Sequence, residues 1–220
     1  ERVIIEYNGM WLVSNFEKMQ LPTGWGVEQQ ITCVDGSTFQ MYMANMKSIF
    51  MDMIKNTDMV IFNRCKKEDP LPTYRRGIKV ANQRAEVIFE DEEGELGDIF
   101  QDEMPFDMNA PVIEILPEDY GIWFVDAMDH PENYEGKTVK FKARVMKPRG
   151  MGSKFFVPGR TAMTCCADDT TFLGYVCKSA YAPKLTPGEW VEVTAKVGIE
   201  KRNEYQGEEG IVLSAEHVEQ

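Results

Sequence analysis

The chain has 220 residues, with 24 Lys and Arg against 36 Asp and Glu, so its formal net charge at pH 7 is −12. This balance argues against a nucleic-acid partner, because such binders need clustered Lys and Arg. No apolar run approaches the roughly 18 residues of a membrane-spanning helix, and residues 1–6 lack a signal-peptide layout. Five irregularly spaced cysteines favour reduced thiols, so we expect a cytoplasmic protein without a membrane segment.

The first half of the chain alternates predicted strands and helices, which indicates a parallel sheet with right-handed crossovers. The expected strands cover 3–5, 31–36, 59–62 and 85–89, and the expected helices begin at Ser14, cover 46–54 and cover 73–82. The continuous apolar run at 59–62 is typical of a parallel strand that is covered on both faces. Cys33 is expected in the core. Because the chain opens on a strand-like run without a methionine, we expect a fragment of a longer protein.

Polar side chains follow three of these strands at the point where each strand ends. Glu6, Asp35 and Asn63 hold these positions. In parallel sheets, ligands bind beyond the carboxyl ends of the strands, so this shared position predicts a binding site. The alternative is that these polar residues only begin loops.

Four segments of this half follow a family pattern in the same order. Residues 3–9 end in E-x-x-G, residues 34–39 match V-D-x-x-x-F, residues 58–64 form an apolar strand that ends in Asn and Arg, and residues 78–85 carry a similar Asn and Ala. Together they resemble the C-terminal part of a P-loop GTPase domain of the CobW type, a family of metal-insertion GTPases and metallochaperones. The resemblance implies that Glu6 acts near the γ-phosphate and Mg²⁺, that Gly9 is the switch glycine and that Asn63 contacts the base.

Two departures from that pattern limit what this chain can do. The phosphate-binding loop G-x-x-x-x-G-K-[ST] does not occur in it, so the resemblance implies GTP and magnesium only for a longer parent protein. GTPase activity is therefore left open for the chain itself. In addition, Lys66 stands where the family has its base-reading aspartate, which argues against guanine selectivity.

An acidic stretch joins the two halves. Residues 90–107 contain nine acidic residues and no Lys or Arg, which predicts a solvated linker or lid, or else an acidic patch that attracts metal. We therefore expect an α/β domain at 1–98, an acidic linker at 99–111 and a second domain at 112–220.

The second half is predicted to be a helix followed by five short strands. The helix after Pro117 buries Tyr120, Trp123, Phe124 and Met128. The expected strands cover 139–145, 155–157, 172–177, 190–197 and 211–218. This pattern favours a small OB-like β-barrel. The predicted fold class is therefore α/β plus β: a partial P-loop-GTPase-like parallel sheet with flanking helices, followed by an OB-like barrel.

Cysteines gather in the second half. Cys165 and Cys166 are adjacent, two aspartates follow, and Cys177 comes a short strand later. Adjacent Cα atoms lie about 3.8 Å apart, which is too close for an unstrained disulfide. Zinc is the first metal to consider for these three thiolates, and an aspartate or His217 would complete the site. The alternatives are that the thiols are core side chains or carry out redox chemistry.

Residues 133–137, the run 156–168, Gly174 and the Trp190-Val191 pair resemble the soluble domain of the YcgQ-like family, which accompanies a predicted permease. The two resemblances imply a CobW-like fragment fused to a YcgQ-like domain that serves zinc homeostasis or metallochaperone work. Its implied partner is a metal-requiring client protein or a permease. The alternative function is a non-enzymatic protein-interaction module with a nucleotide-free α/β scaffold.

Overall fold

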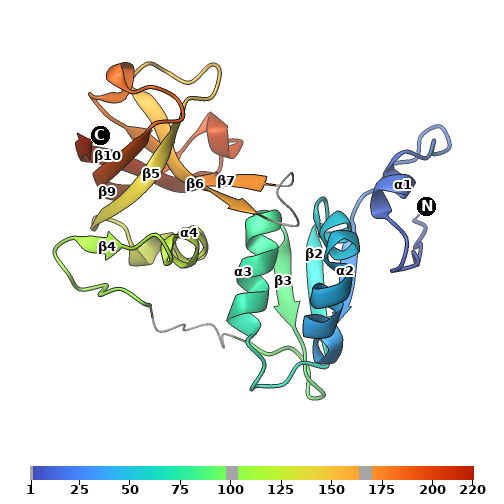
Figure 1. The fold of residues 1–220 in the computed structure, drawn as a ribbon. Helices are drawn as coiled ribbons and strands as arrows, with labels where there is room; N and C mark the ends of the chain where they lie inside the picture. Colours follow the sequence, from blue (N-terminus) through green and yellow to red (C-terminus); the bar gives the residue numbers. More distant parts are fainter. Residues whose placement is uncertain (1, 98–103, 164–169) are drawn as a thin grey trace. The chain divides into compact units, whose positions relative to one another are not determined.

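The structure is a computed structural model that describes residues 2–97, 104–163 and 170–220. The described residues form two compact units, an α/β unit within residues 2–97 and a barrel unit within residues 104–162 and 170–220 (Figure 1). Within the described ranges, no helix has both the length and the apolar character needed to cross a membrane.

The α/β unit contains a three-stranded parallel sheet in the order β1-β2-β3. Its elements are α1 (Val13–Glu17), β1 (Ile31–Asp35), α2 (Phe39–Ile54), β2 (Met59–Asn63), α3 (Leu71–Ala81) and β3 (Glu86–Phe89). Each crossover runs through one helix, so the alternation predicted from the sequence is confirmed for 31–89. Both crossovers move in the same direction along the sheet, and α2 and α3 therefore cover the same face (Figure 1).

The core of this unit lies between that face and the two helices. Val60, Phe62 and Phe89 of the sheet belong to one buried cluster with Phe50 and Ile54 of α2. The opposite face carries apolar side chains that alternate with these. Its members in register are Ile31, Cys33, Met59, Ile61 and Ile88.

Two sequence expectations about this sheet are wrong. Strand β2 was expected to be covered on both faces, but the described part of the unit places helices on one face only. Cys33 was expected in the core and is exposed, because its side chain points to the uncovered face. Strand sequence alone does not tell which face the crossover helices will cover.

The strand expected at residues 3–5 does not form. Val3, Ile4 and Ile5 belong to no strand and are 57%, 97% and 56% exposed. A strand is stabilised by the ladder that it makes with a neighbour, and this segment pairs with no described strand. An apolar run therefore predicts a tendency to pair, while the neighbour decides whether a strand forms.

The barrel unit has five strands that close into a ring. Its elements are β4 (Ile113–Ile115), α4 (Tyr120–Asp129), β5 (Thr138–Met146), β6 (Phe155–Met163), β7 (Thr170–Gly174), β8 (Val176–Lys178), β9 (Trp190–Lys201) and β10 (Glu209–Glu219). Around the ring, β5 pairs with β9, β9 with β10, β10 with β8, β8 with β6, and β6 again with β5. All these pairs are antiparallel except β8 with β10, an arrangement compatible with an OB-like barrel.

Helix α4 contributes large side chains to the core of this unit. Trp123 is fully buried and its ring lies 4.9 Å from that of Phe141 on β5 and 5.6 Å from that of Tyr175. The hydroxyl of Tyr120 donates a hydrogen bond to the Leu173 carbonyl at 3.2 Å. The buried face predicted for this helix is confirmed for Tyr120, Trp123 and Phe124, whereas Met128 is only partly buried.

Candidate functional site

The carboxyl edge of the parallel sheet is where ligands bind in folds of this kind, and it holds two of the predicted site residues. Asp35 ends β1 and Asn63 ends β2, and the two residues are paired in register. The expectation that these two strand ends share one edge is therefore confirmed. Glu6 is exposed and follows no strand, and no described hydrogen bond or ion pair links it to Asp35 or Asn63. Gly9 is exposed in a turn, where its carbonyl accepts a hydrogen bond from Tyr42 at 3.3 Å.

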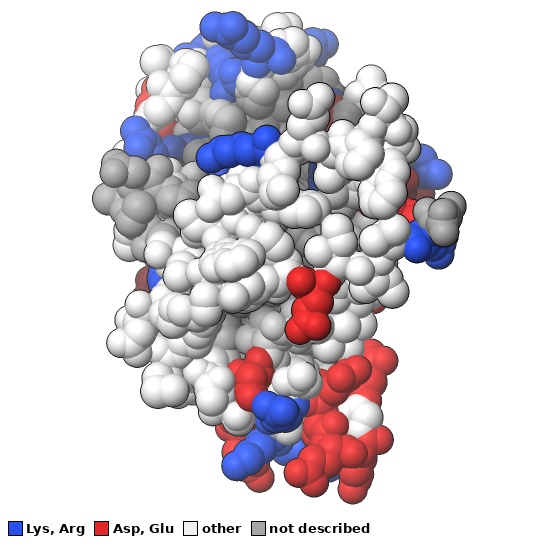
Figure 2. Space-filling view, turned by 90° about the vertical axis from the view of Figure 1, so that its right-hand side faces the viewer, with Lys and Arg blue, Asp and Glu red and all other residues white. Residues whose placement is uncertain are grey.

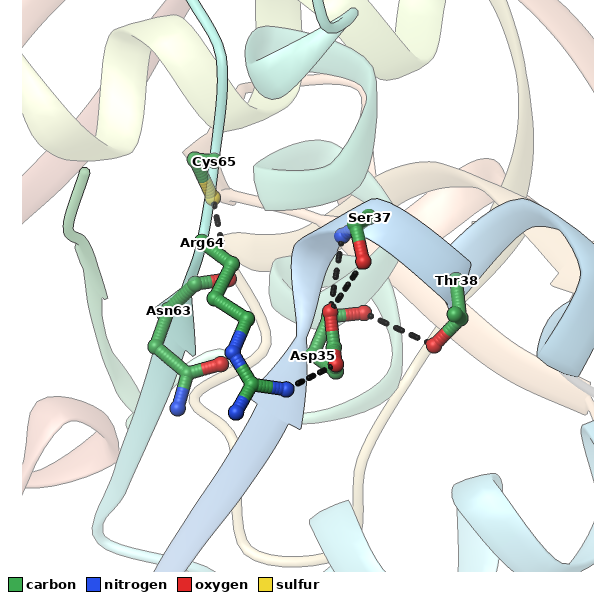
Figure 3. A network of polar contacts seen from close by, with 6 residues as sticks. All are labelled: Asp35, Ser37, Thr38, Asn63, Arg64 and Cys65. Atoms are coloured by element: carbon green, nitrogen blue, oxygen red, sulfur yellow. Dashed lines mark hydrogen bonds and ion pairs between the residues drawn. The ribbon is translucent and has the colours of Figure 1, made fainter. Parts of the chain in front are cut away.

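The Asp35 carboxylate is fully engaged (Figure 3). One of its oxygens accepts hydrogen bonds from the backbone N–H of Ser37 at 3.0 Å and from the Ser37 hydroxyl at 2.6 Å. Its other oxygen lies 2.6 Å from Nη1 of Arg64. The hydrogen bond from Ser37, and after it the contact with Arg64, lowers the pKa of Asp35. A carboxylate held in this way caps the turn after β1 and is a poor proton acceptor.

The loop after β2 is tightly built around Cys65. Arg64 has a φ of +54°, in the left-handed region that non-glycine residues seldom adopt. The Cys65 thiol is buried, and Gly36 packs closely against it. The Cys65 backbone N–H donates a hydrogen bond to the Glu90 carbonyl at 2.9 Å. Burial, and after it the charge of Asp69, raises the pKa of Cys65 to about 11. This thiol therefore stays protonated near neutral pH and is not a nucleophile.

One buried polar atom at this edge has no hydrogen-bond partner in the part of the chain that the structure describes. The Asn63 Oδ1 atom is buried and accepts no hydrogen bond from the described residues. Figure 3 shows the Asn63 amide beside the Arg64 side chain that reaches Asp35. The sheet edge thus offers one free hydrogen-bond acceptor, Asn63 Oδ1. Its carboxylate, that of Asp35, already has partners, and its thiol, that of Cys65, is neutral. This set holds three strand ends together and contains no base with a nearby nucleophile.

The cysteine prediction concerns residues in the second half of the sequence. Cys165 and Cys166 lie outside the described residues, as do Asp168 and Asp169. Cys177 is fully buried on β8, and burial raises the pKa of its thiol to about 12. Zinc binds the thiolate form, so Cys177 would have to lose its proton to act as a ligand. No group of three potential metal ligands occurs among the described side chains, and zinc binding stays a prediction that rests on Cys165 and Cys166.

His217 does not join Cys177. It is exposed on β10 and lines a hollow of about 300 Å³ on the outer surface of the barrel. The lining comprises Val112, Glu114, Lys140, Glu192, Thr194, His217 and Glu219. Within it, Lys140 Nζ lies 2.8 Å from Glu192 Oε1, so that carboxylate already has a cationic partner.

The barrel surface also carries a group that the sequence did not single out, which we call the Trp190 cluster (Trp190, Lys142, Arg144 and Arg160). Trp190 opens β9, is 46% exposed and stands opposite Arg144 of β5. Its ring centre lies 6.0 Å from Lys142 Nζ, 5.9 Å from Arg144 Cζ and 5.4 Å from Arg160 Cζ. These distances allow cation–π attraction.

The three cations of the Trp190 cluster have no carboxylate partner among the described residues. Arg144 donates from Nε to the Gly188 carbonyl at 3.1 Å, and Arg160 donates to the Lys142 carbonyl at 3.4 Å. The carboxylate opposite Lys142, that of Glu192, pairs with Lys140. The alternation of Lys140, Lys142 and Arg144 with apolar residues predicts a solvent-exposed strand face from the sequence. That Trp190 and Arg160 lie beside these cations follows only from the pairing of β5 with β9 and β6.

The fold and these sites define a two-unit protein in which a three-stranded α/β unit is joined to a five-stranded barrel that has a cationic aromatic surface. The family model of the DUF1980 C-terminal domain matches residues 95–220, and the chain belongs to this family. This match covers the whole barrel unit.

The family match corrects both resemblances drawn from the sequence. Residues 95–220 match the DUF1980 C-terminal domain, and neither a CobW nor a YcgQ relationship is supported. The roles that the CobW resemblance implied for Glu6, Gly9 and Asn63 therefore lose their basis. Short motifs such as E-x-x-G and V-D-x-x-x-F arise readily wherever apolar strands end in polar turns, which explains how the chain imitates that pattern.

Two solved structures of the mitochondrial single-stranded-DNA-binding protein Rim1 from S. cerevisiae are similar to part of the chain. They are 10% and 11% identical, and each match covers 38% of this chain and 93% of the Rim1 chain with a TM-score of 0.23. At that TM-score the likeness carries no argument about the fold or the ligand. No curated protein matches the chain.

Proposed function

We propose that the chain is a non-enzymatic protein-interaction module whose Trp190 cluster binds an acidic segment of a partner protein. The observation that carries this proposal is the half-exposed ring of Trp190 with three cations within 6.0 Å and no described carboxylate to neutralise them. Like charges gathered at one place repel each other, and a bound anion removes that repulsion.

The residue types of the cluster suit a protein partner. Trp and Arg are the side chains that most often dominate protein–protein binding energies. Here they stand on the paired strands β5, β6 and β9, which hold the backbone of the cluster rigidly. An acidic segment that also carries an apolar side chain would satisfy both the cations and the exposed indole.

An acidic protein segment fits this surface better than a nucleic acid. The chain carries a net charge of −12, and Glu114, Glu192 and Glu219 line the hollow on the same outer surface of the barrel. A nucleic-acid backbone has a charge at every phosphate and would be repelled by these carboxylates, whereas a short segment needs to meet only the cluster.

A non-enzymatic role agrees with the chemistry of the sheet edge. Asp35 is held by Ser37 and Arg64, and the raised pKa of Cys65 keeps its thiol neutral. These residues stabilise the ends of the strands and leave no activated group for catalysis. The α/β unit then serves as a scaffold.

A binding experiment with defined probes tests this function. The probes are a fluorescein-labelled peptide of alternating glutamate and leucine residues, the same peptide with lysine in place of glutamate, and a labelled 20-mer of deoxythymidine. We expect the chain to bind the glutamate peptide in preference to the other two, as read by fluorescence anisotropy. Arg144→Glu should weaken this binding at least about tenfold, the effect of losing roughly 1.4 kcal/mol.

The matched control is Lys196→Glu, which makes the same kind of charge reversal at an exposed position of β9 outside the cluster. This variant should bind almost as the wild type does. Equal losses in the two variants would show that only net charge matters and would overturn the proposal. Preferred binding of the deoxythymidine probe would replace the proposed partner class with single-stranded nucleic acid.

A further inference from the structure

The sheet of the α/β unit has one closed edge and one open edge. At the β3 edge, the chain turns back so that Glu90 bridges to Glu95 and the Leu96 N–H donates to the Phe89 carbonyl at 2.8 Å. At the other edge, β1 pairs with β2 on one side, and no described strand pairs with its outer side. Proteins usually protect such an edge, because its row of N–H and C=O groups readily pairs with another strand.

An apolar segment at the start of the chain contacts residues that precede and follow β1 in the sequence, and it does not pair with this strand. Arg2 Nη2 lies 3.3 Å from Glu28 Oε1, shortly before β1 begins, and the Tyr42 hydroxyl donates to the Gly9 carbonyl at 3.3 Å, shortly after β1 ends. The residues between these two contacts include Val3, Ile4 and Ile5, which are more than half exposed. The segment is therefore tied at one end to Glu28, before β1, and at the other to Tyr42 of α2, while its apolar side chains are exposed to solvent.

The surroundings of this edge are apolar as well. Ile31 of β1 is 48% exposed, and Cys33 is exposed on the sheet face that α2 and α3 leave uncovered. Figure 2, seen from the side on which the N-terminal segment and α1 lie, shows a broad area with few charged side chains. The largest exposed side chains in this part of the sequence include Trp11, Met19 and Trp25.

We propose that the outer edge of β1 is a docking site for an extended, apolar segment of a partner protein, which joins the sheet as an added strand. The open edge specifies this occupant, because only an extended backbone can satisfy a row of N–H and C=O groups. The exposed side chains of Ile4, Ile5 and Ile31 specify its apolar character. The site lies in the α/β unit and is separate in its residues from the Trp190 cluster.

A peptide pair tests this site in the full chain. The first probe has five valine and isoleucine residues between two lysines at each end, and the second is the same peptide with proline in place of its central residue. We expect the first peptide to bind and to slow amide hydrogen exchange in residues 31–35. The proline peptide should bind at least tenfold more weakly, because proline lacks an N–H and interrupts a strand ladder.

Substitutions distinguish peptide binding at the β1 edge from nonspecific binding to other exposed apolar side chains. Ile4→Lys changes a residue that is 97% exposed, so folding should not depend on it, and it should reduce peptide binding severalfold. Ile31→Lys should have a larger effect. Leu116→Lys, at a side chain of the barrel unit that is 47% exposed, is the control and should bind as the wild type does.

Three results would overturn the docking site. These are no binding of the first peptide, equal binding of the two peptides, or protection from exchange elsewhere than at β1. Arg144→Glu should leave binding of the apolar peptide unchanged, so the outcome here is independent of the outcome for the Trp190 cluster.

Discussion

Gly36 shows how one residue governs the sheet edge. A Cβ atom at this position would lie 2.7 Å from Cys65 Sγ and 3.0 Å from the Asn63 carbonyl oxygen. The missing side chain therefore lets the loop after β1 approach the loop after β2. As a result, the Asp35 carboxylate binds the N–H and the hydroxyl of Ser37 and also the guanidinium of Arg64.

Gly36→Ala should destabilise the α/β unit by about 1–3 kcal/mol, the usual cost of forcing extra atoms into a packed site. Urea unfolding followed by circular dichroism measures the change. Gly77→Ala is the matched control, because nothing lies within 4 Å of a Cβ there and alanine is preferred in a helix such as α3.

The control variant should be unchanged or more stable by about 0.5–1 kcal/mol. Adding Cys65→Ala to Gly36→Ala should cost less than the sum of the two single changes, because the clash with the sulfur is removed. Strict additivity would show that the contact with Cys65 is not the cause.

At the scale of elements, hydrophobic periodicity predicted the helices and strands well because it reflects local packing. Strands β1, β2 and β3 and helix α3 fall close to their expected places, whereas α2 ends where expected but begins at Phe39, seven residues before the apolar stripe that predicted it. The prediction was wrong where pairing decides the outcome. The apolar run that includes Ile4 needed a neighbouring strand, and the exposure of Cys33 depended on which face the crossover helices took.

The two candidate sites also differ in how far the sequence could predict them. Asp35 and Asn63 could be placed together from sequence because parallel strands share their carboxyl ends. The Trp190 cluster could not, because its members come from β5, β6 and β9, which are adjacent only through the closure of the barrel. Each strand alone shows an ordinary polar alternation.

Tyr205, in the short 3-10 helix Asn203–Tyr205, joins two elements of the barrel. Its hydroxyl accepts a hydrogen bond from the Val176 N–H at 3.2 Å and donates to the Ile211 carbonyl at 2.5 Å. Tyr205→Phe should lower the free energy of unfolding by about 1–3 kcal/mol, because two backbone groups lose this partner. Thermal or urea unfolding measures the loss.

Tyr181→Phe is the matched control for this change. Tyr181 is 43% exposed and its hydroxyl makes no hydrogen bond to a described residue, so the substitution should have almost no effect. Equal stability of the Tyr205→Phe variant and the wild type would contradict a bridging role for Tyr205.

At the scale of the whole molecule, the barrel unit has the features of an independently folding domain. Its ring of strands closes on itself, it has its own aromatic core, and the family model matches 95–220. A fragment of residues 95–220 should therefore fold alone and unfold cooperatively on heating, as followed by circular dichroism.

A second fragment, residues 95–208, provides the control because it lacks β10. Without this strand, β8 and β9 lose their common neighbour and the ring cannot close. We expect this shorter fragment to show no cooperative transition. A broad, non-cooperative melt of the longer fragment would instead show that the barrel depends on the α/β unit.

The ring closure also has a consequence for the order of folding events. The pairs that close the barrel join residues far apart in sequence, such as Thr138 with Lys196 and Val176 with Val212. High contact order of this kind makes folding slow, because a long loop must be ordered before the contact stabilises it. The α/β unit is built from short crossovers, so its sheet can assemble while the barrel is still open. During that interval the unpaired strands of the barrel are the part of the chain most exposed to aggregation.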